Sequence, residues 1–141
     1  MAVTVNHRLF YLLNIAQHRV YKYADKQADK EMGISITQLG ALMVINENEG
    51  CLLKDLANTL DLNNSALTGL GNRLEQNGYV KREACSNDGR ASRLFLTKTG
   101  KEKVAKAIPL IQQLNEQIHA DFTEDELKVI AKFLTHLISH F

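Results

Sequence analysis

The amino-acid sequence predicts a mainly α-helical domain with one small β-hairpin and long helices at both ends of the chain. Apolar residues recur every three or four positions over most of the 141 residues, as they do on one face of an α-helix. A two-residue alternation replaces this spacing only around the polar segment 86–89. Hydrophobic residues form 45% and charged residues 23% of the chain, so a single domain of this length can bury a core.

The first helix is expected over residues 6–31 and the second over 36–46. One face of the first helix carries apolar residues at spacings of four and three: Leu9, Leu13, Ala16, Val20 and Tyr23. Gly33 is expected to end this helix. Ser35 and Gln38 have the spacing of a capping box, in which each side chain bonds the other residue's backbone N–H.

Two shorter helices are expected next, over 53–60 and from about 64 to 77. Leu52 stands where a polar cap of the third helix is usual, whereas either Asn63 or Asn64 can cap the fourth helix. Residues 61–64 form the turn between the two helices. Gly78 is expected to end the fourth helix in the left-handed conformation.

Residues 79–84 and 92–97 are predicted to be the strands of a hairpin whose turn lies at 86–89. Thr97 then caps a long fifth helix, which Pro109 is expected to kink because proline lacks a backbone N–H. Thr123 and Glu126 form a second predicted capping box, which opens the last helix. The apolar stripes of the first and last helices need partners, and a small central domain offers little surface for them. This favours a homodimer.

Two short helices followed by a hairpin form a winged helix-turn-helix, in which the second helix enters the major groove of DNA. Leu67, Leu70 and Leu74 share one face of that helix and leave a short polar face for DNA. The candidate DNA contacts on the helix are Asn64, Ser65, Ala66, Thr68, Gly69, Asn72 and Arg73. Arg73 can form a bidentate contact with guanine.

Two glycines lie inside this fourth helix. Gly69 and Gly71 each cost about 1 kcal/mol relative to alanine in a helix. They indicate either a close approach of the backbone to DNA or to a neighbouring helix, or sequence drift.

The hairpin supplies the candidate wing. The Asp88 carboxylate near Arg90 can hold the guanidinium in one rotamer, ready for a narrow minor groove. Arg93 lies further along the strand, where it either contacts phosphate or braces the wing. Further basic residues are assigned to DNA phosphates: Lys54, Lys81, Arg82, Lys98 and Lys101.

Charge is distributed unevenly along the chain. The whole chain carries a formal charge of +1. From Cys51 to Lys106, ten basic residues stand against six acidic ones, which leaves the rest of the chain at −3. A basic centre between acidic ends is expected of a module that binds nucleic acid at its centre and protein at its ends.

Six short motifs together resemble those of a known family. They are Ile34-Ser35-x-x-Gln38, Leu56-Ala57, Ser65-x-x-Thr68, Arg73-Leu74-Glu75-x-x-Gly78-Tyr79-Val80, Asp88-x-Arg90-Ala91 and Leu96-Thr97-x-x-Gly100. Their order over nearly the whole chain resembles the multiple-antibiotic-resistance regulators, the MarR family.

The resemblance implies a homodimer that represses transcription from a pseudo-palindromic operator on double-stranded DNA. It implies a DNA-binding lobe at 34–98, dimerisation helices at 1–33 and 99–141, and minor-groove insertion of Arg90. It also implies a pocket for a small aromatic or phenolic effector, with His7, Phe10, Tyr11, Met43 and Arg90 as wall residues. The chain departs from the family at Gly69, where a basic residue is frequent, and at Leu52, where a hydroxyl is usual.

The main alternative is a winged-helix protein-interaction module without specific DNA binding, because the total charge is near zero and the fourth helix carries one cation, Arg73. A regulator gated by a metal on His136 and His140, completed by His119 or His7, or by oxidation of Cys85, is a further alternative.

Other classes of function lack support in the sequence. No catalytic motif is present, so neither an enzyme nor a bound cofactor or metal is expected. Two widely separated cysteines and the lack of a long apolar run predict a cytoplasmic protein without a membrane span.

Overall fold

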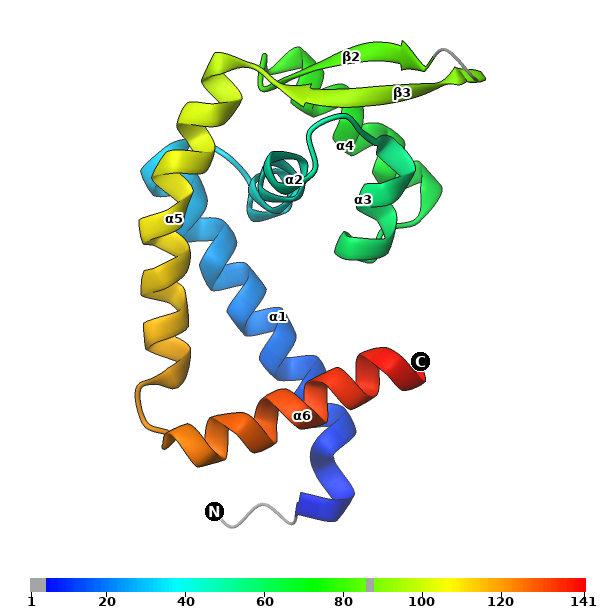
Figure 1. The fold of residues 1–141 in the computed structure, drawn as a ribbon. Helices are drawn as coiled ribbons and strands as arrows, with labels where there is room; N and C mark the ends of the chain where they lie inside the picture. Colours follow the sequence, from blue (N-terminus) through cyan, green and yellow to red (C-terminus); the bar gives the residue numbers. More distant parts are fainter. Residues whose placement is uncertain (1–4, 86–87) are drawn as a thin grey trace. The chain divides into compact units, whose positions relative to one another are not determined.

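The computed structural model describes the backbone of residues 5–85 and 88–141 and the side chains of residues 8–84 and 92–141. The elements follow one another as α1 (Val5–Met32), α2 (Ile36–Glu47), β1 (Cys51–Leu52), α3 (Leu53–Leu60), α4 (Asn64–Gln76), β2 (Val80–Cys85), β3 (Asp88–Leu96), α5 (Lys98–His119) and α6 (Glu124–His140) (Figure 1). They form two compact units, Met1–Ala107 and Ile108–Phe141. The predicted mainly helical fold with a small hairpin is confirmed.

The core of the first unit lies around α2. Leu39, Leu42 and Ile45 of this helix are fully buried. Equally buried residues come from the neighbouring elements: Leu56 of α3, Leu70 and Leu74 of α4, and Leu94 of β3. Because truncating a buried leucine costs about 2–5 kcal/mol, this core fixes the positions of α3, α4 and the hairpin.

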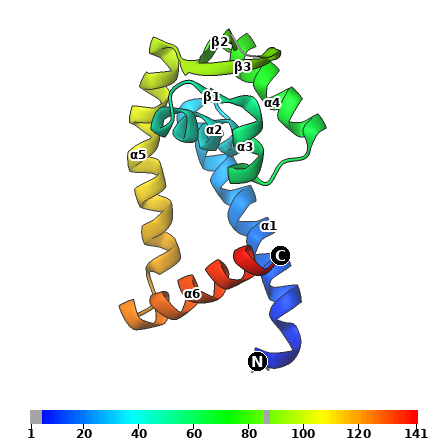
Figure 2. The same ribbon diagram turned by 45° about the vertical axis from the view of Figure 1, so that its right-hand side comes forward.

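The three strands form one antiparallel sheet in the order β1-β3-β2. Cys51 pairs with Leu94 and Val80 pairs with Leu96, and the β2–β3 hairpin lies beside α4 (Figures 1 and 2). The two-residue strand β1 has no counterpart in the sequence-based prediction, because two residues are too few to show an alternating pattern.

Strand β3 is longer than the sequence predicts. Strand β3 begins at Asp88, not at Ser92, so Asp88, Gly89 and Arg90 belong to the strand and not to the turn. Cys85 pairs with Asp88 after an irregularity between Ala84 and Cys85. Backbone pairing, which defines an antiparallel strand, thus extends β3 through residues that lack alternating polarity. The rest of the predicted turn, residues 86–87, lies outside the described residues.

Side-chain caps begin α2 and α4. The Ser35 hydroxyl oxygen accepts from the Gln38 backbone N–H at 3.1 Å, and the Asn63 side-chain oxygen accepts from that of Ala66 at 2.8 Å. The predicted capping box at α2 forms only in its serine half, because the Gln38 side-chain oxygen accepts instead from the Asn77 amide at 3.3 Å. Asp25 of α1 supplies a second cap, since its carboxylate accepts from the Ile36 N–H at 2.9 Å.

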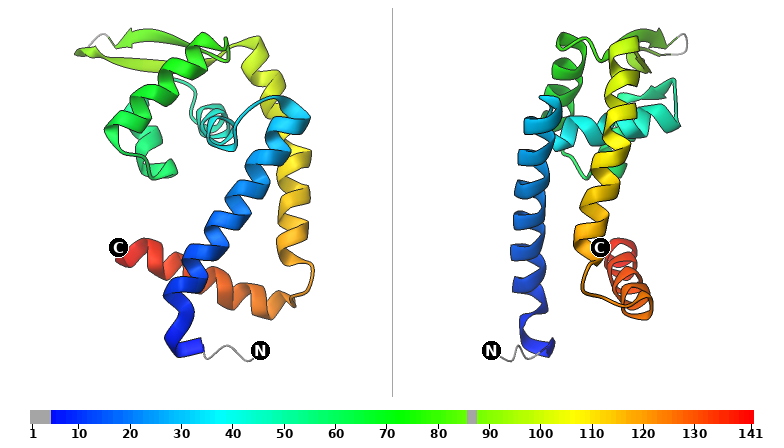
Figure 3. Two further views of the ribbon diagram at one scale, coloured as in Figure 1. Left: turned by 180° about the vertical axis from the view of Figure 1, so that it is seen from behind. Right: turned by 90° about the vertical axis from the view of Figure 1, so that its left-hand side faces the viewer.

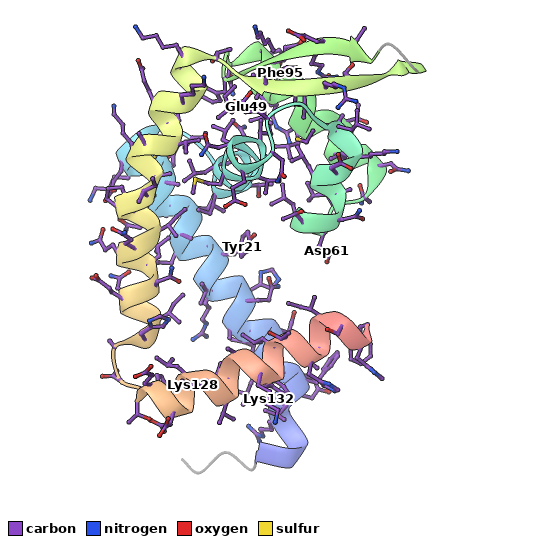
Figure 4. All side chains as sticks on the ribbon, in the orientation of Figure 1. Tyr21, Glu49, Asp61, Phe95, Lys128 and Lys132 are labelled. Atoms are coloured by element: carbon purple, nitrogen blue, oxygen red, sulfur yellow. The ribbon has the colours of Figure 1, made fainter. Side chains whose placement is uncertain are left out.

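Helix α3 begins without a side-chain cap from Leu52. The Asp55 carboxylate accepts from the backbone N–H of Leu52 at 2.9 Å and satisfies that otherwise free donor. The helix ends at Asp61, whose left-handed backbone has a φ of 54° (Figure 4). The acidic side chain at the third helical position therefore makes its own half of a capping box, and leucine at position 52 cannot make the other half.

The start of α5 is joined to the segment between α4 and β2. The Thr97 hydroxyl accepts from the Gly100 N–H at 3.1 Å and donates to the Gly78 carbonyl at 2.6 Å. The Thr97 backbone N–H donates to the Tyr79 carbonyl at 3.0 Å. One turn later, the Lys103 ammonium donates to the Met32 carbonyl at 2.5 Å and lies 5.9 Å from the centre of the Tyr79 ring. Helix α5 continues through Pro109.

The second unit contains α6, and both halves of its predicted capping box form. The Thr123 hydroxyl accepts from the Glu126 N–H at 3.2 Å, and the Glu126 carboxylate accepts from the Thr123 N–H at 2.9 Å. These bonds to the Thr123 backbone N–H and hydroxyl hold the pKa of Glu126 below its ordinary value of 4.5. Lys128 forms an exposed ion pair with Glu124 one turn away, at 3.9 Å (Figure 4).

The stability of the first turn of α6 is expected to depend on pH, because the Glu126 carboxylate forms part of its cap. A depressed pKa means that the folded state favours the ionised carboxylate. The stabilisation that Glu126 gives to the folded helix is therefore complete above the ordinary pKa of the carboxyl group, and it is lost as the pH falls through the lowered pKa of the folded state. NMR titration of the Glu126 carboxyl carbon should give a midpoint below 4.5. Glu126→Gln keeps an acceptor for Thr123 and should remove this titration, whereas a midpoint at or above 4.5 would contradict the cap.

Candidate nucleic-acid interface

Helix α4, the recognition helix, presents one apolar and one polar face. Its buried residues are Leu67, Leu70, Gly71 and Leu74. The predicted DNA contacts lie on the opposite side, where all are exposed except the half-buried Gly69: Asn64, Ser65, Ala66, Thr68, Gly69, Asn72 and Arg73. The hairpin formed by β2 and β3, the wing, lies next to α4 and contacts it through β2 (Figure 3). The structure therefore brings together the two elements that the sequence assigns to DNA.

The Arg73 side chain lies back along α4 over Gly69. A methyl group at Gly69 would lie 3.3 Å from an Arg73 terminal guanidinium nitrogen. Side chains on a helix point toward its N-terminus, which carries the charge of Arg73 onto the middle of the exposed face. The absent side chain at Gly69 thus leaves room for a guanidinium there.

Gly71 has a different role from Gly69, because it is buried between elements. A methyl group at Gly71 would lie 2.7 Å from a guanidinium nitrogen of Arg82 in β2 and 3.0 Å from a Leu53 methyl carbon of α3. Of the explanations left open by the sequence, close approach to neighbouring protein elements accounts for Gly71.

Two polar side chains of the exposed face already have partners. The Thr68 hydroxyl donates to the Asn64 carbonyl at 3.0 Å, so its oxygen remains as an acceptor. The Asn72 side-chain oxygen accepts from Arg82 at 3.1 Å, and the Arg82 Nε lies 3.8 Å from the Glu75 carboxylate. The sequence does not single out Glu75 beyond its place in a motif.

Arg93 is bonded to the protein itself. Its guanidinium donates to the Gly50 carbonyl at 2.9 Å, beside the pairing of β1 with β3. Nearby, the Glu49 carboxylate accepts from the Leu96 N–H at 3.4 Å, and a methyl group at Gly50 would lie 3.4 Å from the ring of Phe95 (Figure 4). The sequence predicts that Arg93 either contacts phosphate or braces the wing, and its bond to the Gly50 carbonyl supports the bracing role. The side chains of Asp88 and Arg90 lie outside the described residues.

The other predicted phosphate contacts lie at element ends and on the wing. Lys54 is exposed in the first turn of α3, and Lys98 and Lys101 are exposed in the first turn of α5. Lys81 of β2 is exposed and lies 3.9 Å from Glu83. Arg82 is the exception, because its side chain is only 23% exposed.

The predicted effector residues whose side chains are described, Phe10, Tyr11 and Met43, do not line the hollow described below. Phe10 and Tyr11 are 79% and 64% exposed, with ring centres 5.5 Å apart, and Met43 is half-buried on α2. The side chain of His7 lies outside the described residues. A hollow of about 450 Å³ is lined by Val44, Asn48, Glu49, Gly50, Cys51, Asp55 and Thr59. Partial burial, together with Asp55 and Glu49, raises the pKa of the Cys51 thiol.

Among the described residues, no three His, Cys, Asp or Glu side chains are grouped to hold a metal ion. The His136 and His140 rings stack on each other with centres 5.7 Å apart. The side chain of Cys85 lies outside the described residues. None of the helices in the described part of the chain is long and apolar enough to cross a membrane.

Comparison with known proteins agrees with this arrangement. The MarR family model matches residues 34–92, which include α2, the recognition helix and most of the wing. The homoprotocatechuate degradative operon repressor of Escherichia coli is 30% identical over 112 residues, which cover 79% of this chain and 73% of that protein. The chain belongs to the MarR family.

Other relatives extend the likeness. The HTH-type transcriptional regulator BilQ of Clostridioides difficile is 30% identical over 93 residues, 66% of this chain and 63% of BilQ. The crystal structure of Sco3205, a MarR family transcriptional regulator from Streptomyces coelicolor, in complex with DNA, superposes with a TM-score of 0.86 at 23% identity. The superposition covers 97% of this chain and 88% of the Sco3205 chain. The predicted family and the winged-helix fold are thus confirmed.

Proposed function

We propose that this MarR-family chain is a homodimeric, sequence-specific DNA-binding transcriptional regulator that represses from a pseudo-palindromic operator. The observation that carries the proposal is the exposed polar face of the recognition helix beside the wing. Relatives named as transcriptional regulators, one as a repressor, support it, as does the DNA complex of Sco3205. Residues 34–98 are the DNA-binding lobe.

Exposed apolar side chains on the terminal helices support the dimer. In α1 they include Leu9, Phe10, Tyr11, Leu13 and Val20. In α6 they include Val129, Ile130, Phe133, Leu134 and Ile138. Many exposed apolar side chains on the same helices mark a protein–protein contact, so residues 1–33 and 99–141 are the dimerisation helices. Two-fold symmetry then places the recognition helices about 34 Å apart, one turn of DNA.

The exposed groups of α4 suit different parts of the DNA. Arg73 and Asn72 can reach base edges, whereas Ser65 and Thr68 can bond bases or phosphates. On the wing, Arg90 enters the minor groove with Asp88 holding its guanidinium, and Arg93 supports the strand from within the protein. Exposed lysines at 54, 81, 98 and 101 neutralise phosphates.

A small aromatic or phenolic compound is the proposed effector, and its side-chain partners are His7, Phe10, Tyr11 and Met43. A relative named for a homoprotocatechuate degradative operon supports it. Such a ligand shifts the regulator only if it binds one arrangement of the dimer more tightly than another. The protein acts in the cytoplasm without enzymatic activity.

Substitution of Arg90 by alanine is expected to weaken operator binding about tenfold, because the negative potential of a narrow minor groove attracts a guanidinium and hydrogen bonds to a charged group are worth about 1.5–3 kcal/mol. Selection from random duplexes should first enrich an inverted repeat with the unsubstituted protein. Anisotropy titrations at several salt concentrations then compare the two proteins on that duplex. The slope of log K against log salt should become less steep by about 0.9 for Arg90→Ala if one phosphate contact is also lost.

Failure to enrich any duplex, with weak binding that is the same for both proteins, would reject the proposal. It would favour the alternative of a protein-interaction module.

A further inference from the structure

Arg82 of β2 is directed toward the recognition helix. One terminal nitrogen donates to the Asn72 side-chain oxygen at 3.1 Å, and Nε lies 3.8 Å from the Glu75 carboxylate. This Nε is buried and has no hydrogen-bond partner, so the ion pair with Glu75 is its compensation. The side chain is only 23% exposed, whereas that of its neighbour Lys81 is 63% exposed.

Gly71 makes this contact between strand and helix possible. A methyl group at Gly71 would meet the Arg82 guanidinium at 2.7 Å, well inside van der Waals contact. Any larger residue at this point of α4 would displace the guanidinium or the helix. Asn72, Glu75 and Gly71 therefore form a seat for Arg82, which we call the α4 seat.

The Arg82 contact also fixes the orientation of the Asn72 amide. A guanidinium has hydrogen-bond donors only, so the Asn72 atom that it bonds must be the oxygen. The two N–H groups of the amide nitrogen are then left to donate to DNA, on a side chain that is exposed. Paired contact with adenine needs both the oxygen and the nitrogen of the amide, whereas contact with N7, O6 or a phosphate needs only the donors.

We propose that Arg82 is a positioning residue, which holds α4 against β2 and sets the Asn72 amide as a donor toward DNA. The consequence for DNA binding rests on the proposed function, whereas the seat itself is a property of the free protein. The sequence assigns Arg82 to a phosphate contact, and its burial against α4 supports the positioning role instead.

Two variants test the seat in the DNA-free protein by amide hydrogen exchange. Arg82→Lys keeps the charge but cannot bond Asn72 and reach Glu75 in the same geometry, because an ammonium lacks the planar fork of a guanidinium. Glu75→Gln removes the ion pair at a half-exposed position and should not prevent folding. Both should speed exchange in α4 several-fold and leave exchange in α6 unchanged. The control Lys81→Gln should leave exchange in α4 unchanged.

The same variants are titrated with a labelled duplex enriched by the unsubstituted protein and with a scrambled duplex of the same composition. Arg82→Lys and Glu75→Gln should reduce the preference for the enriched duplex about tenfold without changing the salt slope, because bonds to a charged group are lost without a phosphate contact. Lys81→Gln should lower the slope by about 0.9 on both duplexes.

Opposite results would overturn the proposal. Unchanged exchange in α4 for both variants would show that Arg82 does not hold the helix. A third variant, Arg82→Gln, removes the charge. A full preference for the enriched duplex in Arg82→Lys, together with a salt slope lowered by about 0.9 in Arg82→Gln, would establish a phosphate contact instead. If no duplex is enriched, the proposed function fails, but the exchange measurement still decides whether the seat exists.

Discussion

Replacement of Gly100 by alanine is expected to lower the free energy of unfolding by about 3 kcal/mol, because it overpacks a site that cannot relax. The added methyl group would overlap the Tyr79 carbonyl oxygen. That oxygen belongs to the backbone and already accepts from the Thr97 N–H at 3.0 Å, so it cannot rotate away as a side chain would. The first turn of α5 would have to move, and with it the contact between Thr97 and the Gly78 carbonyl.

Thermal unfolding at a fixed protein concentration measures this effect, because the stability of a dimer depends on concentration. A loss of about 3 kcal/mol corresponds to roughly 6–12 °C in Tm for a chain of this size. Gly78→Ala is the matched control, since Gly78 has a φ of 75° but no atom within 4 Å of an added methyl group. It should cost only the left-handed strain, about 1 kcal/mol. Equal losses in the two variants would mean that the overlap at Gly100 is relieved.

Local signals in the sequence predict most helix ends correctly. Thr123 and Glu126 cap α6 as expected, and Asn63 caps α4, because the two partners of each cap lie three residues apart. The same reasoning fails for Gln38, whose partner Asn77 lies 39 residues away. A local pattern carries no information on a competing partner that only the packed chain supplies. The two-residue strand β1 is missed for the same reason, since only its pairing with β3 defines it.

In the candidate site, too, the local sequence predicts some features, and only the packed chain defines the others. The exposed residues of α4 follow from the spacing of its buried leucines, so the sequence predicts which side chains face outward. It does not distinguish Gly69 from Gly71, because both cost the same within an isolated helix. Their neighbours differ. The guanidinium of Arg73 lies beside Gly69, whereas the side chains of Arg82 and Leu53 lie against Gly71. Likewise, a basic residue on a strand says nothing about whether it faces DNA or, like Arg82, the protein.

Substitution of Arg73 by alanine is expected to weaken binding to the enriched duplex about 10- to 100-fold, the value of a good bidentate contact with guanine. Arg73 is the one cation on the described residues of α4, and its guanidinium lies over Gly69 in the middle of the exposed face. No other side chain of this helix can replace its charge. Anisotropy titration with the enriched duplex and with duplexes changed at one base pair per half-site measures both affinity and discrimination.

Arg73→Lys separates base recognition from simple charge. It should keep most of the salt slope, because an ammonium still neutralises a phosphate, but it should lose the preference at one base pair, because it cannot bond two acceptors in one plane. Lys98→Ala is the comparison for a phosphate contact and should weaken binding equally on all duplexes. If Arg73→Lys retains the full preference, Arg73 acts as a charge alone. Specificity would then depend on the wing and on the donors of Asn72.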